Sequence, residues 1–169
     1  MQLAKRLDRI SEPQTIKMAK LGRELRAQGC DLIDLSLGEP DFSTPAFICQ
    51  AATEAMNEGY TKYTPVVGYP ELRKAISEKL KRDNGLDYAI DEIIVSTGAK
   101  QSLANAVLSL VNPGDEVIIP TPYWVTYSAL VSLSEGKVKY IDCTIDTDFK
   151  LTPDRLEAAI TANTKLFIF

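Results

Sequence analysis

The stretch that most constrains the fold is residues 93–111, where a short apolar run, a glycine-containing turn and a longer apolar segment follow one another. The first run is Ile93, Ile94 and Val95, which predicts a buried strand. Residues 103–111 contain neither proline nor glycine and predict a helix. A strand, a tight turn and a helix in this order are typical of α/β proteins.

The turn between them, residues 96–102, predicts an anion site. The first backbone N–H groups of a helix have no partner within the helix and lie at the positive end of its dipole. Gly98 and the small residues Ser96 and Thr97 would let a phosphate approach these groups. The same residues also fit an ordinary strand-to-helix turn capped by Ser96 or Thr97, so this motif alone leaves both interpretations open.

Strand and helix patterns alternate with short links from residue 93 onward, which predicts an α/β fold with a mostly parallel, doubly wound sheet. Further short apolar runs predicted to be strands lie at residues 32–36, 116–119, 137–141 and 165–169. Predicted helices, several of them with proline in the first turn, lie at residues 11–28, 44–58, 70–84, 123–133 and from 152 onward. Because the last strand has nothing after it, we expect the chain to be the first part of a larger protein.

Composition excludes several classes of function. The net charge is −4 and no basic stripe is present, so we expect no nucleic-acid partner. No apolar run approaches the roughly 18 residues needed to span a membrane, and the N-terminus lacks the pattern of a signal peptide. Histidine is absent, which excludes a histidine-based triad, and we expect no metal site. Cys30, Cys49 and Cys143 lie outside any CxxC pattern and predict reduced, buried thiols in a cytoplasmic protein.

Five short motifs occur in register along the chain, at residues 36–42, 61–73, 96–102, 112–117 and 122–127. In this order and spacing they resemble the class I aminotransferases that use pyridoxal 5′-phosphate, and most of all the bacterial aspartate aminotransferases. The resemblance runs from about Ser11 to Phe169. It implies a homodimer whose large cofactor-binding domain is only partly present. Residues 1–45 would then form an N-terminal arm with small-domain elements, and residues 46–169 the first part of the large domain.

The resemblance also implies cofactor-binding residues. Gly98, Ala99 and Lys100 would hold the cofactor phosphate through backbone N–H groups, and Trp124 would stack on the pyridine ring. Tyr63 would reach the phosphate of the neighbouring subunit. By themselves the same residues also fit other interpretations: Trp124 could be a core tryptophan and Tyr63 a loop aromatic packed on the surface.

The substrates implied by the resemblance are an amino acid and a 2-oxo acid. The backbone N–H of Gly38 would meet the substrate α-carboxylate, and Trp124 would also border the substrate. Lys100 would meet the distal carboxylate of aspartate or glutamate, assisted by Thr15. The alternatives are a turn glycine at position 38 and, for Lys100, a solvated charge or a phosphate contact.

No catalytic residue is assigned, because the family's Schiff-base lysine lies in a segment beyond the residues matched here. We therefore expect the chain by itself not to catalyse amino transfer, and the activity to belong to the full-length parent. Two alternatives remain open: a lyase or synthase of the same fold, and a non-catalytic domain that resembles an aminotransferase. A NAD-binding domain is disfavoured, because no G-x-G-x-x-G follows a strand.

Overall fold

The computed structural model describes residues 3–11, 13–36 and 38–169; Leu37, within the 36–42 motif, lies outside them. The described chain divides into two compact units. One, here named the sheet unit, contains the residues before 37 together with Gly98–Phe169. The other, here named the helical unit, is Gly38–Thr97. The sequence-based boundary between residues 45 and 46 remains a prediction.

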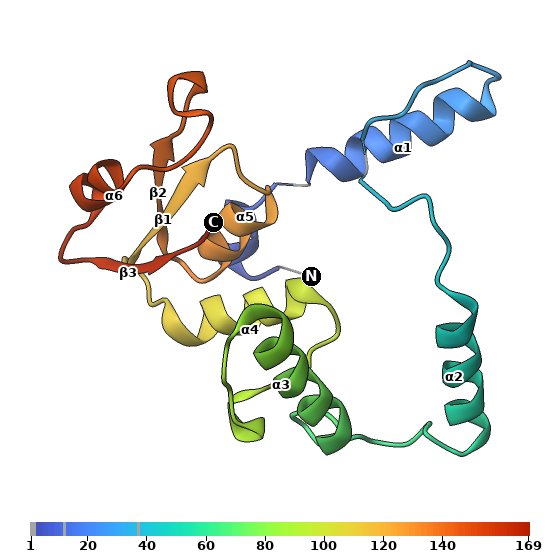
Figure 1. The fold of residues 1–169 in the computed structure, drawn as a ribbon. Coiled ribbons are helices and arrows are strands. Elements are labelled where there is room, and N and C mark those ends of the chain that lie inside the picture. The colour runs from blue at the N-terminus through green and yellow to red at the C-terminus, as the bar shows by residue number, and fades with distance from the viewer. Residues whose placement is uncertain (1–2, 12, 37) are drawn as a thin grey trace. The chain divides into compact units, whose positions relative to one another are not determined.

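Six α-helices and three strands make up the described chain (Figure 1). The helices are α1 (Gln14–Ala27), α2 (Ala46–Asn57), α3 (Pro70–Asn84), α4 (Ala99–Leu110), α5 (Thr126–Leu133) and α6 (Pro153–Ala159). The strands are β1 (Glu116–Thr121), β2 (Lys137–Asp142) and β3 (Thr164–Phe167). Short 3₁₀ turns lie at Lys5–Arg9, Ile90–Glu92 and Ile145–Thr147. No helix among the described residues combines the length and the apolar character needed to cross a membrane.

The three strands form a parallel sheet in the order β2-β1-β3. The central strand β1 pairs Val117 with Val138 of β2 and Ile118 with Phe167 of β3. This confirms the expected α/β class and the parallel pairing. Parallel pairing also places the carboxyl ends of β1 and β3 at the same edge of the sheet, which is where α/β proteins bind ligands.

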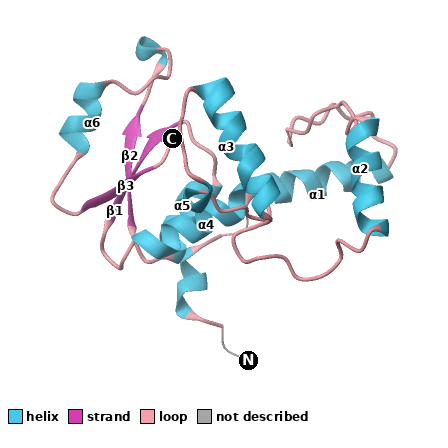
Figure 2. Cartoon of the chain, turned by 60° about the horizontal axis from the view of Figure 1, so that its bottom comes forward, coloured by secondary structure: helices cyan, strands magenta, loops and turns pink. Residues whose placement is uncertain are grey.

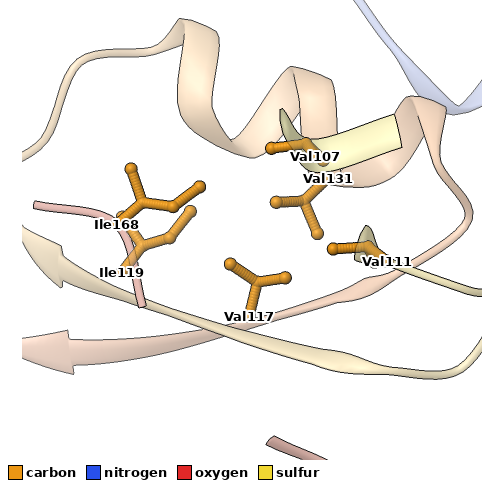
Figure 3. Close-up of a cluster of buried hydrophobic side chains, with 6 residues drawn as sticks. All are labelled: Val107, Val111, Val117, Ile119, Val131 and Ile168. Carbon is orange, nitrogen blue, oxygen red and sulfur yellow. The ribbon is translucent and has the colours of Figure 1, made fainter. Parts of the chain in front are cut away.

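Alternating residues of β1 supply the core on both faces of the sheet. Val117 and Ile119 pack on one face in a cluster completed by Val107, Val111, Val131 and Ile168 (Figure 3). Ile118 points to the other face and packs with Ile141 and Ala159. Helices α4 and α5 therefore cover one face and α6 covers the other, as Figures 1 and 2 show. Burying each large side chain of this kind stabilises the fold by about 1.5–3 kcal/mol.

Two predicted strands are wrong. Residues 93–95 are extended but belong to no sheet, and the Val95 N–H donates to the carbonyl of Val67 at 3.0 Å. Residues 32–36 are also not a strand, and Ile33 and Leu35 are exposed. A β-strand needs a neighbouring strand to pair with, and the local apolar pattern does not say whether one is present.

Helix starts also differ from the predictions. Helix α1 begins at Gln14 with Pro13 as its N-cap, whereas the sequence predicted Ser11 as the N-cap and Pro13 in the first turn; Pro13 is still extended, with φ −57° and ψ 130°. Helix α5 begins at Thr126 rather than residue 123. Helix α4 begins at Ala99, earlier than the predicted start at residue 103. The predicted start of α3 at Pro70 is confirmed.

The predicted burial of the cysteines is confirmed for Cys143 and wrong for Cys30 and Cys49. Cys143 is buried, whereas Cys30 and Cys49 are exposed, and all three are free thiols. Cys30 follows the end of α1 and Cys49 lies in α2, which has no buried residue among the residues described. An isolated cysteine carries no periodic signal of its own, so its burial depends on which neighbours cover it.

Candidate functional site

The start of α4 has a backbone that requires glycine. Gly98 precedes the helix with φ 82° and ψ 162°, a combination that is essentially restricted to glycine. A Cβ built on Gly98 would have no atom within 4 Å. The conformation, and not crowding, therefore accounts for the glycine, and the space around it is open.

The first turn of α4 presents backbone donors to this open space. The carbonyl of Gly98 accepts hydrogen bonds from the N–H groups of Gln101 at 3.2 Å and Ser102 at 3.4 Å. The N–H groups of Ala99 and Lys100 come before these and have no acceptor within the helix. Residues 98–100 are exposed. The helix start can therefore donate to an anion.

Within the helical unit, two residues of the 61–73 motif contact residues 90–95, the segment that precedes this turn in the sequence. A Cβ on Gly68, whose φ is +97°, would lie 2.7 Å from Val95 Cβ, so only glycine permits this approach. The guanidinium of Arg73 donates to the carbonyl of Ile93 at 2.9 Å and also to that of Ile90. Gly68 and Arg73 thus have a structural role in fixing residues 90–95.

Trp124 lies just after β1 and is 40% exposed, so it is not a core tryptophan. Its carbonyl accepts the N–H of Tyr127 at 2.9 Å. Its indole meets the ring of Tyr127 edge to face, with centroids 5.7 Å apart and planes at 82°. Beside it is a largely apolar hollow of about 510 Å³. The other residues lining this hollow include Pro120, Pro122, Phe149, Phe167 and Phe169.

The sheet unit brings Lys100 and Trp124 together. Lys100 Nζ lies over the Trp124 ring, 5.2 Å from its centroid, in the geometry of a cation–π contact. Lys100 also lines a second hollow of about 510 Å³, together with Arg9, Gln14 and Tyr123. A single ammonium group therefore touches the aromatic face and borders a separate, more polar space.

Two tyrosines form part of the wall of this second hollow. The rings of Tyr123 and Tyr140 stack with centroids 5.3 Å apart and planes at 29°, and their hydroxyl oxygens are 3.0 Å apart. The Tyr123 hydroxyl also donates to Ser128 Oγ at 3.3 Å. The hydrogen bond with Tyr123, followed by partial burial, raises the pKa of Tyr140 above its ordinary value.

The other sequence-predicted residues are Thr15, Gly38 and Tyr63. Thr15 is the second residue of α1 and is half-buried, and its neighbour Gln14 lines the same hollow as Lys100. Gly38 and Tyr63 belong to the helical unit and are described only within it. The Tyr63 side chain is fully exposed there.

These residues fit a ligand with an anionic group and a flat ring. The exposed N–H groups at the start of α4 suit a phosphate. The partly exposed indole of Trp124, beside an open hollow, suits stacking on an aromatic ring. Among residues 3–11, 13–36 and 38–169, no three His, Cys, Asp or Glu side chains are grouped to hold a metal ion.

Sequence reasoning missed the contribution of Tyr140. Tyr123 falls in the 122–127 motif, whereas Tyr140 is one of several polar positions in a predicted strand. The two rings meet because β1 and β2 are adjacent and parallel. No local signal reveals this contact; only the pairing of the strands does.

Comparison with known proteins gives a consistent result. The family pattern described as aminotransferase class I and II matches residues 30–169. The aspartate/prephenate aminotransferase of Cereibacter sphaeroides is 52% identical over 167 residues, which are 99% of this chain and 42% of that relative. The chain thus spans less than half the length of this relative.

Solved structures agree with the sequence matches. The aspartate aminotransferase from Rhizobium meliloti has a TM-score of 0.93 and 48% identity, covering 99% of this chain and 42% of that one. The aspartate aminotransferase from Thermus thermophilus with maleate has a TM-score of 0.95 and 41% identity, covering 99% and 44%. The three-stranded sheet and its helices therefore match part of the aspartate aminotransferase fold.

Proposed function

Since this chain belongs to the class I and II aminotransferases, we propose that it supplies the phosphate cradle, the stacking ring and part of the substrate pocket of such an enzyme. The full-length protein would move an amino group between aspartate or glutamate and a 2-oxo acid. The observation that carries this proposal is the contact between Lys100 and Trp124 beside the open start of α4. Because the chain covers 42% of its relatives, the proposal for the chain itself concerns binding.

The family uses pyridoxal phosphate, which when bound supplies an electron sink for bonds at the α-carbon of an amino acid. In this proposal the N–H groups of Ala99 and Lys100 donate to its phosphate, where each charge–dipole contact contributes about 0.3–1 kcal/mol. Gly98 keeps the approach open. The Trp124 ring stacks on the pyridine, contributing about 0.5–1.5 kcal/mol beyond the burial of area.

Lys100 would select the substrate. Its ammonium borders a polar hollow as well as the Trp124 ring, so it can bind a carboxylate at the far end of a substrate. Thr15, on the same unit, would assist, and Gly38 would meet the α-carboxylate. The relative from Thermus thermophilus was solved with maleate, a dicarboxylate of the kind that this proposal requires.

Two further parts of the proposal concern assembly and location. Tyr63 would reach the cofactor phosphate of a second subunit, which requires a homodimer; its full exposure within the helical unit is compatible with this role. The protein would be cytoplasmic. Residues 1–45 would form the arm and small-domain part, and residues 46–169 the large-domain part.

Two experiments test the proposal. Trp124 is the one tryptophan in the sequence, so its fluorescence should be quenched on titration with pyridoxal phosphate and change again on adding maleate. No quenching with pyridoxal phosphate would contradict the cofactor site.

The second experiment uses the full-length protein, which should transfer the amino group of aspartate to 2-oxoglutarate. Products of elimination or condensation would instead favour the lyase or synthase, and cofactor binding without turnover would favour a non-catalytic domain.

A further inference from the structure

We propose that Tyr140 is a positioning residue for Trp124: it holds Tyr123, and Tyr123 holds the turn that presents the indole. The consequence for cofactor binding rests on the proposed function, whereas the geometry does not depend on it. Tyr140 is on β2, and Trp124 comes after β1. The proposal therefore links the site to the neighbouring strand of the sheet.

The first link is between strand and turn. The stacked rings of Tyr123 and Tyr140 and their 3.0 Å hydroxyl contact fix the Tyr123 side chain in two ways. The backbone of Tyr140 is held in the sheet, because the next residue, Ile141, is buried in the core and lies opposite Pro120 of β1 in the register. A rigid strand thus carries the group that holds the turn.

The second link closes the turn around Trp124. The Tyr123 hydroxyl donates to Ser128 Oγ at 3.3 Å, and the Ser128 hydroxyl donates to the carbonyl of Val125 at 3.2 Å. These bonds join the residue before Trp124 to residues after it. The N–H of Tyr127 donates to the carbonyl of Trp124 at 2.9 Å. The backbone on both sides of the indole is therefore tied.

The direction of the hydrogen bonds follows from proton counting. A tyrosine hydroxyl has one proton to donate, and that of Tyr123 goes to Ser128. Tyr140 must therefore donate to the Tyr123 oxygen. This agrees with the raised pKa of Tyr140, since donating to Tyr123 favours its protonated form. The chain of hydrogen bonds runs from Tyr140 through Tyr123 and Ser128 to the carbonyl of Val125, which accepts the last one.

Trp124 needs this support because burial alone does not hold its partly exposed indole. The indole is 40% exposed and makes an edge-to-face contact with Tyr127 and a contact with the flexible Lys100 side chain. Stacking on a flat ligand needs a ring held at a defined tilt. Tyr140 fixes that tilt from the opposite end of the hydrogen-bond chain.

The test uses the fluorescence of Trp124 in the protein without cofactor. Tyr140→Phe keeps the ring and removes the hydroxyl, whereas Tyr140→Leu removes both. Tyr60→Phe is the matched control, since Tyr60 pairs with Tyr69 in the helical unit at 5.6 Å. Loss of one hydrogen bond should shift the equilibrium between the ordered and the disordered form of the turn at Trp124 roughly 2- to 10-fold. Acrylamide quenching of Trp124 should rise and its anisotropy fall in Tyr140→Phe, further in Tyr140→Leu, and not in the control.

Two further measurements keep the test decisive. If Tyr140→Leu fails to fold by circular dichroism, Tyr140→Phe and Tyr123→Phe decide, and both should loosen Trp124. Unchanged quenching and anisotropy in these two folded variants would overturn the proposal.

Titration with pyridoxal phosphate separates the positioning role of Tyr140 from the proposed cofactor site. If Trp124 loosens in Tyr140→Phe but the unmodified chain binds no pyridoxal phosphate, positioning stands and the proposed function fails. If the unmodified chain binds it, Tyr140→Phe should bind it more weakly.

Discussion

At the scale of single residues, the proposed site rests on side chains that each make more than one defined contact. Lys100 is the clearest case, because its ammonium contacts the Trp124 ring and borders the hollow formed in part by Tyr123. Its charge can be satisfied by an aromatic face when no carboxylate is present. A substrate carboxylate would compete for the same ammonium group.

Lys100→Met should weaken the binding of maleate by roughly 10- to 100-fold, since a hydrogen bond to a charged group is lost. Lys100→Arg should weaken it less, because the charge remains. Titration followed by Trp124 fluorescence measures both. Lys150→Met is the control: Lys150 is exposed and paired with Asp148 at 2.6 Å. Equal affinity in Lys100→Met and the unmodified chain would contradict the substrate role.

Asp34 should titrate at an unusually low pH. The hydroxyl and N–H of Ser36 donate to its carboxylate at 2.6 and 3.0 Å, and with Arg26 they lower its pKa. The stability that this carboxylate contributes is therefore present above the unperturbed value of about 3.9 and lost as pH falls through the lower value in the folded chain. Carboxyl NMR shifts measure the midpoint, which Ser36→Ala should raise and Ser43→Ala should not. A midpoint at the ordinary value would count against these hydrogen bonds.

At the scale of elements, helix starts and strand faces determine the geometry of the site. Helix α4 begins where Gly98 adopts a backbone that other residues avoid. Strand β1, which leads to Trp124, packs alternating residues into the core on both faces of the sheet. Changes at the start of α4 should therefore act through backbone conformation, and changes in β1 through the packing of the core.

Gly98→Ala should destabilise the fold by about 1–3 kcal/mol through backbone strain, although its Cβ meets no neighbour. Urea unfolding measures the cost. Gly85→Asn is the control, because Gly85 ends α3 in the left-handed region, which asparagine tolerates. An unfolding free energy equal to that of the unmodified chain would show that position 98 does not need glycine.

Ile119→Ala should cost roughly 2–5 kcal/mol, since the side chain is fully buried in the cluster of Figure 3. Ile145→Ala removes the same atoms from a side chain that is 78% exposed, and should change stability by less than about 0.5 kcal/mol. Denaturant unfolding of the two variants compares them directly. Similar losses at both positions would contradict the location of the core.

At the scale of the whole molecule, burial is distributed unevenly. Both hydrophobic clusters consist of residues from 98–169 in the sheet unit. Helices α2 and α3, all of whose residues the structure describes, contain no buried side chain. Local stability follows burial, so the two units should open at different free energies.

Hydrogen exchange should reveal this difference. Amides of β1 should exchange slowest, because Val117, Ile118 and Ile119 are fully buried. Amides of α2 should exchange fastest among the helices of ten or more residues, because their hydrogen bonds are exposed to solvent. Exchange followed by mass spectrometry measures both in one sample. Equal protection of α2 and β1 would contradict an uneven core.

Patterns in the sequence are sufficient to predict the α/β class, the parallel pairing implied by alternating elements, and the motifs that place the chain among aminotransferases. They also indicate the end of α3 near Gly85 and a glycine-containing turn before α4, because backbone restrictions act over a few residues. These features depend on local chemistry.

Tertiary structure alone decided which extended segments become strands and which side chains meet. Residues 93–95 and 116–119 have similar apolar runs, yet only the second has neighbours to pair with and forms a strand. The contact between Lys100 and Trp124, and that between Tyr123 and Tyr140, join residues 17 or more positions apart. Such contacts arise from the packing of separate elements, and no local pattern in the sequence encodes them.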